Sequence, residues 1–216
     1  MNLGLVTSFI VAGILMLGIV MVNINVQNST AELTLAQITR NHVSNITDMI
    51  NDDFSNMGYQ VNKSTSEIDS LENMVLTYAR NNEISFYRNL SDDPTKPPHL
   101  ITWKIDNDDI PNTKNPDHHT LYRLVEDLET GAIDSTAIRT GVTNFFLRYY
   151  NTVGADTQND VTPPGQLKNQ LSNIRQVHVT LELQSAEPIY NRASGQGRYI
   201  RSVWDKRFTP INLNLE

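Results

Sequence analysis

The sequence predicts an α+β fold in which one long amino-terminal helix packs on an antiparallel β-sheet. Three observations predict this fold. The first 31 of the 216 residues carry no charged side chain and are mostly apolar. From there to Met57, apolar residues return every three, four or seven positions, as they do on one face of a helix. Beyond Gly58, runs rich in β-branched and aromatic residues alternate with polar turns, which is typical of strands.

Residues 3–22 are long enough to cross a membrane as a helix. Their only polar side chains are Thr7 and Ser8, and about 20 apolar residues span a hydrocarbon core. A cleaved secretory signal would have a basic start, a shorter apolar core and a small-residue cleavage site. This start has no Lys or Arg, and Asn23, Ile24 and Asn25 follow the apolar run. We therefore expect residues 1–27 to remain in the mature protein as a transmembrane or filament-core helix.

Small residues within this segment predict close contacts between helices. Gly4, Ser8 and Ala12 place a small residue at every fourth position, and such rows let helices approach closely in lipid. The alternative is that Gly and Ala are simply common in membrane helices. The predicted packing surface consists of Leu3, Gly4, Leu5, Ser8, Phe9, Ala12, Gly13, Leu15 and Gly18.

Residues 28–59 are predicted to continue the helix out of the membrane. No Gly or Pro occurs between Gly18 and Gly58, so one helix over residues 3–57 would be about 80 Å long at 1.5 Å per residue. The alternative is a membrane helix, a short linker near residues 28–30 and a separate second helix. The apolar face expected to dock on the sheet consists of Ala36, Val43, Ile46, Ile50, Phe54 and Met57.

Residues 60–216 are predicted to form a globular α+β head domain. The expected strands are 83–88, 100–105, 120–125, 142–150, 174–183 and 198–204. Polar loops are expected at 91–99, 106–118, 151–165 and 185–197, and helices at 66–80 and 166–172. In the run 174–183 the apolar residues alternate with polar ones, which favours an antiparallel sheet with one solvated side.

The sequence offers no residues for catalysis or for a cofactor. It contains no cysteine, which excludes disulfides, thiolate metal sites and a cysteine nucleophile. No P-loop, G-x-S-x-G or H-E-x-x-H motif occurs. His118 and His119 stand near several aspartates, but that run lacks the Gly and Glu of a calcium loop, so we expect a solvated hairpin loop without a metal. His42 and His178 are interpreted as surface or interface residues.

Charge is divided unevenly along the chain. Residues 32–167 carry 10 basic and 20 acidic side chains, whereas residues 168–216 carry 7 basic and 4 acidic ones. Such polarity can steer association between copies or partners, although solvated strand faces would explain it equally well. The absence of an aromatic stacking platform argues against nucleic acid. The basic residues proposed for a subunit contact are Arg192, Arg198, Arg201, Lys206 and Arg207.

Six segments follow one another in a characteristic order along the chain. The first is NDDFSNMGY at 51–59, at the end of the predicted helix. The later segments are ITWKI at 101–105, HTLYRL at 119–124, GVTNFFLRYY at 141–150, IRQVHVTL at 174–181 and FTPINL at 208–213. In this order they resemble the type IV pilin and type II secretion pseudopilin superfamily, in particular minor pilins of the W type and pseudopilins of the J type. The family usually has Glu as its fifth mature residue and Arg in the closing motif. Here residue 5 is Leu, so either Met1 is the mature start of a subunit without that Glu or the chain is processed differently, and Ile211 stands in place of the Arg.

The resemblance implies a pilin-like fold and a structural role rather than an enzymatic one. It implies a minor or tip-type subunit of a pilus-like or secretion filament, made of other pilin or pseudopilin subunits. A membrane platform protein, an assembly motor and a prepilin peptidase are the other implied partners, with membrane lipid around the helix before assembly. The expected location is the inner or cytoplasmic membrane with an exported head, and then a periplasmic or extracellular filament.

Two other classes of protein are alternatives. A single-pass membrane-anchored ligand-binding or sensor domain would need an apolar pocket and a helix ending near Gln27. An anchored hydrolase would need a convergent acid, base and nucleophile, for which the sequence offers only dispersed His and Asp.

Overall fold

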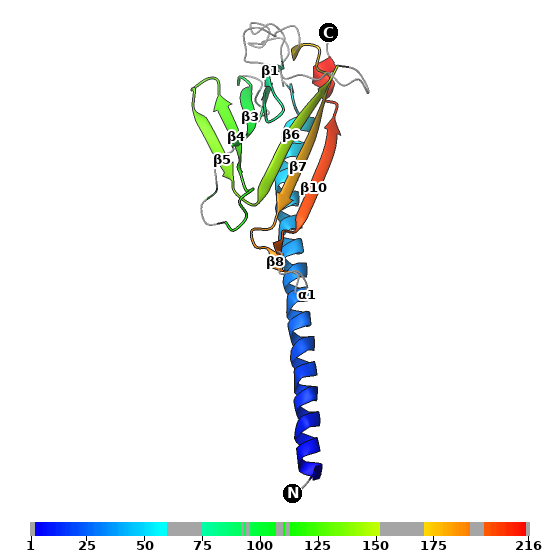
Figure 1. Cartoon of the computed structure of the whole chain (residues 1–216). Coiled ribbons are helices and arrows are strands. Elements are labelled where there is room, and N and C mark those ends of the chain that lie inside the picture. Colours follow the sequence, from blue (N-terminus) through cyan, green and yellow to red (C-terminus); the bar gives the residue numbers. More distant parts are fainter. Residues whose placement is uncertain are drawn as a thin grey trace.

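The computed structural model describes most of the chain. The described residues are 3–59, 75–91, 93, 96–106, 110, 113–151, 171–190 and 197–214. They form an α+β molecule with one long amino-terminal helix and antiparallel sheets, as the sequence predicts. The helix runs along one side of the head, and its first half projects well beyond it (Figure 1).

Helix α1 (Leu3–Ser55) is continuous over 53 residues. It has no break near residues 28–30, so the prediction of one uninterrupted helix is confirmed and the linker alternative is wrong. The polar residues at this point are compatible with a helix because they bond within it. The Thr30 hydroxyl donates to the Val26 carbonyl, and the Thr34 hydroxyl to the Thr30 carbonyl, both at 2.9 Å.

Gly58 ends the helical segment in a left-handed conformation, with φ of 73°. A Cβ there would lie 2.8 Å from the Val75 side chain, so the position needs a glycine for space as well as for backbone angle. The Gly58 N–H donates to the Tyr87 carbonyl at 2.7 Å, which ties the end of the helix to a strand.

Five strands form the larger sheet. They are β1 (Leu76–Ala79), β2 (Glu83–Arg88), β3 (His99–Asp106), β4 (Thr120–Asp127) and β5 (Ile133–Ile138). They pair in sequence order as an antiparallel meander, with β1 and β5 at the edges. Ile84 and Trp103 are partners in the β2–β3 register, and both are fully buried.

Three strands form the second sheet, in the order β10–β7–β6. They are β6 (Val142–Tyr150), β7 (Gln176–Gln184) and β10 (Arg201–Phe208), and a small ribbon joins β8 (Ile189–Tyr190) to β9 (Gly197–Arg198). Val177, Val179, Leu181 and Leu183 of β7 are buried, whereas the polar residues between them, His178, Thr180 and Glu182, are half-buried, so the predicted alternation is confirmed. A short 3-10 helix, η2 (Ile211–Asn214), closes the described chain.

The core lies where α1 meets both sheets. Phe54 of the helix contacts Phe86 of β2, with ring centroids 5.4 Å apart, and Phe208 of β10 at 5.3 Å. Trp103 and Phe145 link the two sheets at 6.4 Å. The helix is therefore part of the head's own core rather than a separate stalk.

Several predicted elements differ from the structure. The helix expected at 66–80 is wrong at its end, because residues 76–79 form strand β1 by pairing with β2. Its first part, and most of the helix expected at 166–172, lie outside the described residues. The sequence also missed β5, and it predicted a loop where β8 forms. One sheet was expected, whereas the described strands form two main sheets, since β6 turns away to pair with β7.

Candidate assembly site

The apolar half of α1 is exposed, without packing against the described part of the head. From Leu5 to Val22 its large apolar side chains are 45% to 70% exposed, and Gly4, Gly13 and Gly18 have nothing within 4 Å of an added Cβ. The other predicted packing residues are exposed too, namely Leu5, Ser8, Phe9, Ala12 and Leu15. The side chain of Leu3 lies outside the described set. An apolar surface of this size is unfavourable in water, so this half of α1 favours an apolar environment.

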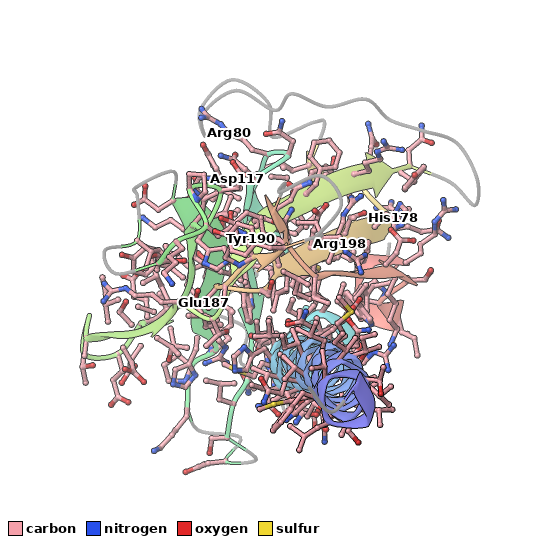
Figure 2. The ribbon with its side chains drawn as sticks, turned by 60° about the horizontal axis from the view of Figure 1, so that its bottom comes forward. Arg80, Asp117, His178, Glu187, Tyr190 and Arg198 are labelled. Atoms are coloured by element: carbon pink, nitrogen blue, oxygen red, sulfur yellow. The ribbon has the colours of Figure 1, made fainter. Side chains whose placement is uncertain are left out.

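This half of α1 is long and apolar enough to cross a membrane once, by its length and composition. The described head residues do not cover any of it, so it is not the core helix of a soluble domain. In Figure 2 the bottom of the molecule is turned forward, and the helix lies at one side of the head. The geometry therefore presents one apolar rod with a laterally attached head.

The second half of α1 carries the predicted docking face. Val43, Ile46, Ile50, Phe54 and Met57 are buried, and Ala36 is half-buried. Their spacing of three, four or seven keeps them on one side of the helix. Leu33 and Ile38, in contrast, remain 70% and 44% exposed. The helix thus has a face committed to the head and another that the described residues leave open.

A buried carboxylate fixes the end of α1 on the larger sheet. Asp53 is fully buried. Its Oδ1 accepts hydrogen bonds from Arg88 Nη1 at 2.8 Å and Arg123 Nη2 at 2.9 Å. Its Oδ2 accepts bonds from Arg123 Nε at 2.6 Å and Trp103 Nε1 at 2.8 Å. A helix and three strands, β2, β3 and β4, therefore converge on one side chain, which sets the height and rotation of the helix.

The opposite charges of Asp53 and its arginine partners stabilise each other. The hydrogen bonds from Arg123 to Asp53 are the main reason why the pKa of Arg123 is raised above its usual value. Arg88 also reaches the exposed Asp52, with 3.0 Å between Nη1 and Oδ2. A buried charge is tolerated when it is paired and hydrogen-bonded. This cluster was not predicted from the sequence, although Asp53 between Ile50 and Phe54 is a charged residue on a buried helix face.

Two of the proposed basic residues contact α1, at points that lie far apart along it. Arg198 pairs with Glu32 of the helix, and Lys206 Nζ donates to Asn51 Oδ1 at 2.7 Å. Glu32 and Asn51 are 19 residues apart in the helix, which corresponds to about 28 Å along its axis. The other members of the group are Arg201, which pairs with Glu182 at 2.5 Å, and Arg207, which lies 4.2 Å from the centre of the Tyr150 ring. Arg192 lies outside the described residues.

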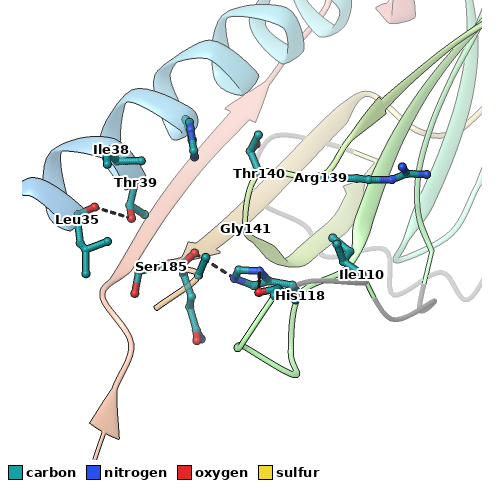
Figure 3. Close-up of a pocket in the computed structure, with 13 residues that line it drawn as sticks. Leu35, Ile38, Thr39, Ile110, His118, Arg139, Thr140, Gly141 and Ser185 are labelled. Carbon is teal, nitrogen blue, oxygen red and sulfur yellow. Dashed lines mark hydrogen bonds between the residues drawn. The ribbon is translucent and has the colours of Figure 1, made fainter. Parts of the chain in front are cut away.

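A cavity of about 400 Å³ lies between α1 and the loops beside β5 and β7 (Figure 3). Leu35 and Ile38 of the helix and Ile110 of a loop form apolar parts of its wall. His118 and Ser185 form a polar part, and the side chain of Arg139 extends away from the helix in this view. The polar groups are mostly satisfied by the protein. Thr39 donates to the Leu35 carbonyl at 2.9 Å, and Ser185 donates to the Glu187 carbonyl at 2.8 Å.

The expectation that His118 lies in a solvated loop is wrong. Its side chain is buried, with Nε2 3.2 Å from the Gln184 carbonyl and Nδ1 2.9 Å from Thr113 Oγ1. Because a carbonyl only accepts, Nε2 carries the proton and the Thr113 hydroxyl donates to Nδ1 of the neutral ring. Burial lowers the pKa of His118. The ring therefore anchors the loop before β4 to the end of β7.

The other histidines are dispersed over the described part of the chain. His178 Nε2 lies 2.7 Å from Asp205 Oδ1 on the neighbouring strand, and His42 lines the cavity. Among the described residues, no group of three or more His, Cys, Asp or Glu side chains is arranged to hold a metal ion.

A comparison with protein-family models and with curated proteins finds no match to this sequence. The function is therefore argued from the geometry of the chain itself.

Proposed function

We propose that this chain is a non-enzymatic structural subunit of a type IV pilus-like or type II secretion-like filament, of the minor or tip type. The observation that carries the proposal is α1, a single helix of 53 residues. Its first half is bare and apolar, while its second half is built into the core of the head.

This arrangement suits storage in a membrane and transfer into a filament. In the membrane, lipid covers the apolar half of α1. On assembly, the same surface packs against the helices of neighbouring subunits, which also keeps it from water. Because α1 is continuous and its end is fixed by Asp53, a displacement of the rod moves the head with it. The polar head then forms the outer surface of the filament.

The resemblance in sequence supports the same proposal and supplies its partners. They are other pilin or pseudopilin subunits, a membrane platform protein and an assembly motor. The minor or tip role rests on the segments similar to W-type pilins and J-type pseudopilins.

Mass spectrometry of sheared extracellular filaments and of the membrane fraction tests the proposal. We expect the chain in the filament fraction with residues 1–26 intact, at low stoichiometry relative to the main subunit. Equal abundance with the main subunit would contradict the minor role. Recovery only from the membrane, as a monomer in detergent, would contradict the filament role altogether.

A membrane-anchored ligand-binding domain is the second candidate, and the cavity beside α1 is the observation that favours it. Its volume of about 400 Å³ is within the range of about 300–1,000 Å³ that small-molecule sites occupy. However, this candidate predicted a helix that ends near Gln27, and α1 continues to Ser55. Native mass spectrometry of the detergent-extracted monomer distinguishes the two, since a resident small molecule is expected only for the ligand-binding domain.

A further inference from the structure

The outer strand of the larger sheet, β5, lies at the side of the head that faces away from α1 (Figures 1 and 2). Its residues 133–137 are exposed, and only Ile138 is buried. Among the described strands it pairs with β4 alone. A Cβ added at Gly131, two residues before the strand, would meet nothing within 4 Å. Within the described part of the chain, no segment covers this edge.

The backbone of β5 directs a row of hydrogen-bonding groups outward. Hydrogen-bonded and non-hydrogen-bonded pairs alternate along an antiparallel ladder. The first bonded pair is fixed by Asp127, whose N–H donates to the Ala132 carbonyl at 2.9 Å, and the register then continues without a shift. Every second residue of β5 therefore turns its N–H and C=O groups away from β4, namely Ile133, Ser135 and Ala137.

This edge lacks the features that usually protect an open strand. Proteins commonly cover such an edge or interrupt it with Lys, Pro or a bulge. β5 contains no Lys or Pro, and its pairing with β4 is regular. An extended segment of about six residues, about 20 Å long, would match its length. The outward N–H and C=O groups can therefore form backbone hydrogen bonds with an added strand.

The charge around β5 is negative. Residues 124–140 contain four acidic side chains and one basic side chain. Three of the acidic residues form no ion pair with any residue that the structure describes, namely Glu126, Glu129 and Asp134. They lie on β4, in the turn and on β5, at the end of the strand that follows the turn. Complementary charge there favours a segment that carries Lys or Arg.

An exposed apolar side chain lies within this negative surface. Ile133 is 62% exposed and is the cross-strand partner of Glu126. An apolar residue on an added strand would cover Ile133, because side chains of directly opposite residues contact each other across a sheet. The edge therefore fits an extended segment in which an apolar residue stands among basic ones.

We propose that β5 receives an extended basic segment of a different protein as an added strand. The basic strand of this chain, β10, packs against α1 through Phe208 and Lys206, so a second copy does not supply the segment. One head holds one such segment, and the contact does not repeat from copy to copy. The proposal goes beyond the filament role and does not depend on it, because the edge belongs to the head alone.

Binding of defined peptides to the full chain in detergent tests the proposal. The probe is a fluorescent peptide of about ten residues that alternates lysine and valine, and fluorescence anisotropy measures its binding. We expect saturable binding that weakens as salt is added. No binding of this peptide would overturn the proposal.

Two control peptides separate charge from strand pairing. The first has glutamate in place of lysine and should not bind. The second keeps the lysines but has every backbone amide methylated, so that it keeps its charge and cannot donate backbone hydrogen bonds. Binding of the methylated peptide equal to that of the probe would overturn strand addition, and equal binding of the glutamate peptide would overturn the choice of a basic partner.

Hydrogen exchange measured by mass spectrometry locates the bound peptide. The amides of residues 133–137 should exchange more slowly when the lysine peptide is bound, because the outward N–H groups then have acceptors. Protection at another segment in place of β5 would overturn the assignment. Slower exchange at 133–137 that rises with protein concentration, without any peptide, would show that a second copy occupies the edge and would also overturn it.

Ser135→Pro removes one outward N–H group and no hydrogen bond to β4, at a kind of edge position that accepts proline. It should weaken binding of the lysine peptide by about tenfold, the effect of one backbone hydrogen bond. Ser135→Val is the matched control, since it keeps the N–H group, and it should bind as the original chain does. Equal binding by the two variants would contradict pairing through the backbone of β5.

Asp134→Lys is a second variant that leaves the backbone intact. Asp134 is exposed and has no ion pair among the described residues. Its reversal should weaken binding of the lysine peptide by about threefold, the range of one exposed ion pair. Unchanged binding would contradict the part assigned to charge.

These outcomes are distinct from those that test the filament role. A chain that is found in filaments but does not bind the lysine peptide would overturn the site on β5 and leave the filament role intact. A chain that binds the peptide at β5 and is absent from filaments would support the site and contradict the filament role.

Discussion

At the scale of single residues, the stability of the head depends on the buried carboxylate of Asp53. Removing its carboxylate in Asp53→Ala leaves Arg88 and Arg123 facing each other and Trp103 Nε1 without its acceptor. Because breaking a buried ion pair costs about 3–5 kcal/mol, we expect the free energy of unfolding to fall by that amount. Thermal and urea unfolding of the detergent-solubilised chain would measure it.

Asp52 provides the matched control. Its side chain is 62% exposed and contacts the same Arg88. Asp52→Ala should therefore cost less than about 1 kcal/mol, as exposed pairs do. Equal effects of the two substitutions would show that burial of the Asp53 carboxylate does not matter.

Gly141 is a second position, where adding a single Cβ atom should lower the stability of the head. Its φ is 87°, and a Cβ would lie 2.4 Å from the Gln184 carbonyl oxygen. The same backbone contact holds the hydrogen bond from Gln184 N to the Gly141 carbonyl, at 2.8 Å. Gly141→Ala should therefore destabilise the head by more than about 1–2 kcal/mol, the cost of the left-handed backbone alone. Gly131→Ala, with φ of 68° and nothing within 4 Å, should show only that cost in the same unfolding assay.

His118 predicts a dependence of stability on pH. Burial lowers its pKa in the folded head below the ordinary value of 6.5. Between these two pKa values the unfolded ring binds a proton and the folded one does not, so the free energy of unfolding rises with pH up to about 6.5. His118→Gln should lose this part of the slope, whereas His119→Gln should keep it. Unfolding curves from pH 5 to 8 would measure both, and an unchanged slope in His118→Gln would contradict the assignment.

At the scale of elements, segments with a regular hydrophobic period could be predicted from the sequence. Elements that form only by pairing with other segments could not. Strands β2 and β6 have the predicted bounds, and α1 ends two residues before its predicted end. β1 was mistaken for the end of a helix because its four residues become a strand only by pairing with β2. β5 was missed because it buries one residue and so lacks the alternation that marks a half-buried strand.

The same distinction applies to the candidate site. The apolar half of α1 and its docking face could be predicted, because helical periodicity and a lack of charge are local properties. The Asp53 cluster could not, because Arg88 and Arg123 are 35 and 70 residues away in the sequence and only the sheet order brings them together. The basic residues were grouped by their proximity in sequence, yet Arg198 and Lys206 contact α1 at residues 32 and 51, far apart along the helix.

The docking of α1 on the head predicts a large effect of a single core aromatic. Phe54 is fully buried and contacts one ring from each sheet, Phe86 and Phe208. Phe54→Ala should destabilise the head by about 3–5 kcal/mol, because it removes a large side chain and leaves a cavity. Val26→Ala, on the exposed part of the same helix, should change the unfolding free energy by less than about 0.5 kcal/mol.

At the scale of the whole molecule, the two halves of α1 should respond independently to substitution. The head encloses its own core with the second half of the helix, whereas the first half is exposed and, under the proposed function, is covered by lipid or neighbouring subunits. A change in the first half should therefore alter where the protein is found without altering how stably its head folds.

Ile14→Lys separates these two properties. Ile14 is exposed near the middle of the apolar segment, and a lysine at the centre of a membrane helix costs about 2.5–3.5 kcal/mol on insertion scales. We expect the membrane-bound fraction to fall sharply while the thermal transition of the head is unchanged. Thr30→Lys, on an exposed turn beyond the segment, should leave both unchanged. If Ile14→Lys also lowered the transition temperature of the head, the apolar half would be part of the folding unit and α1 could not transfer from lipid to filament as a passive rod.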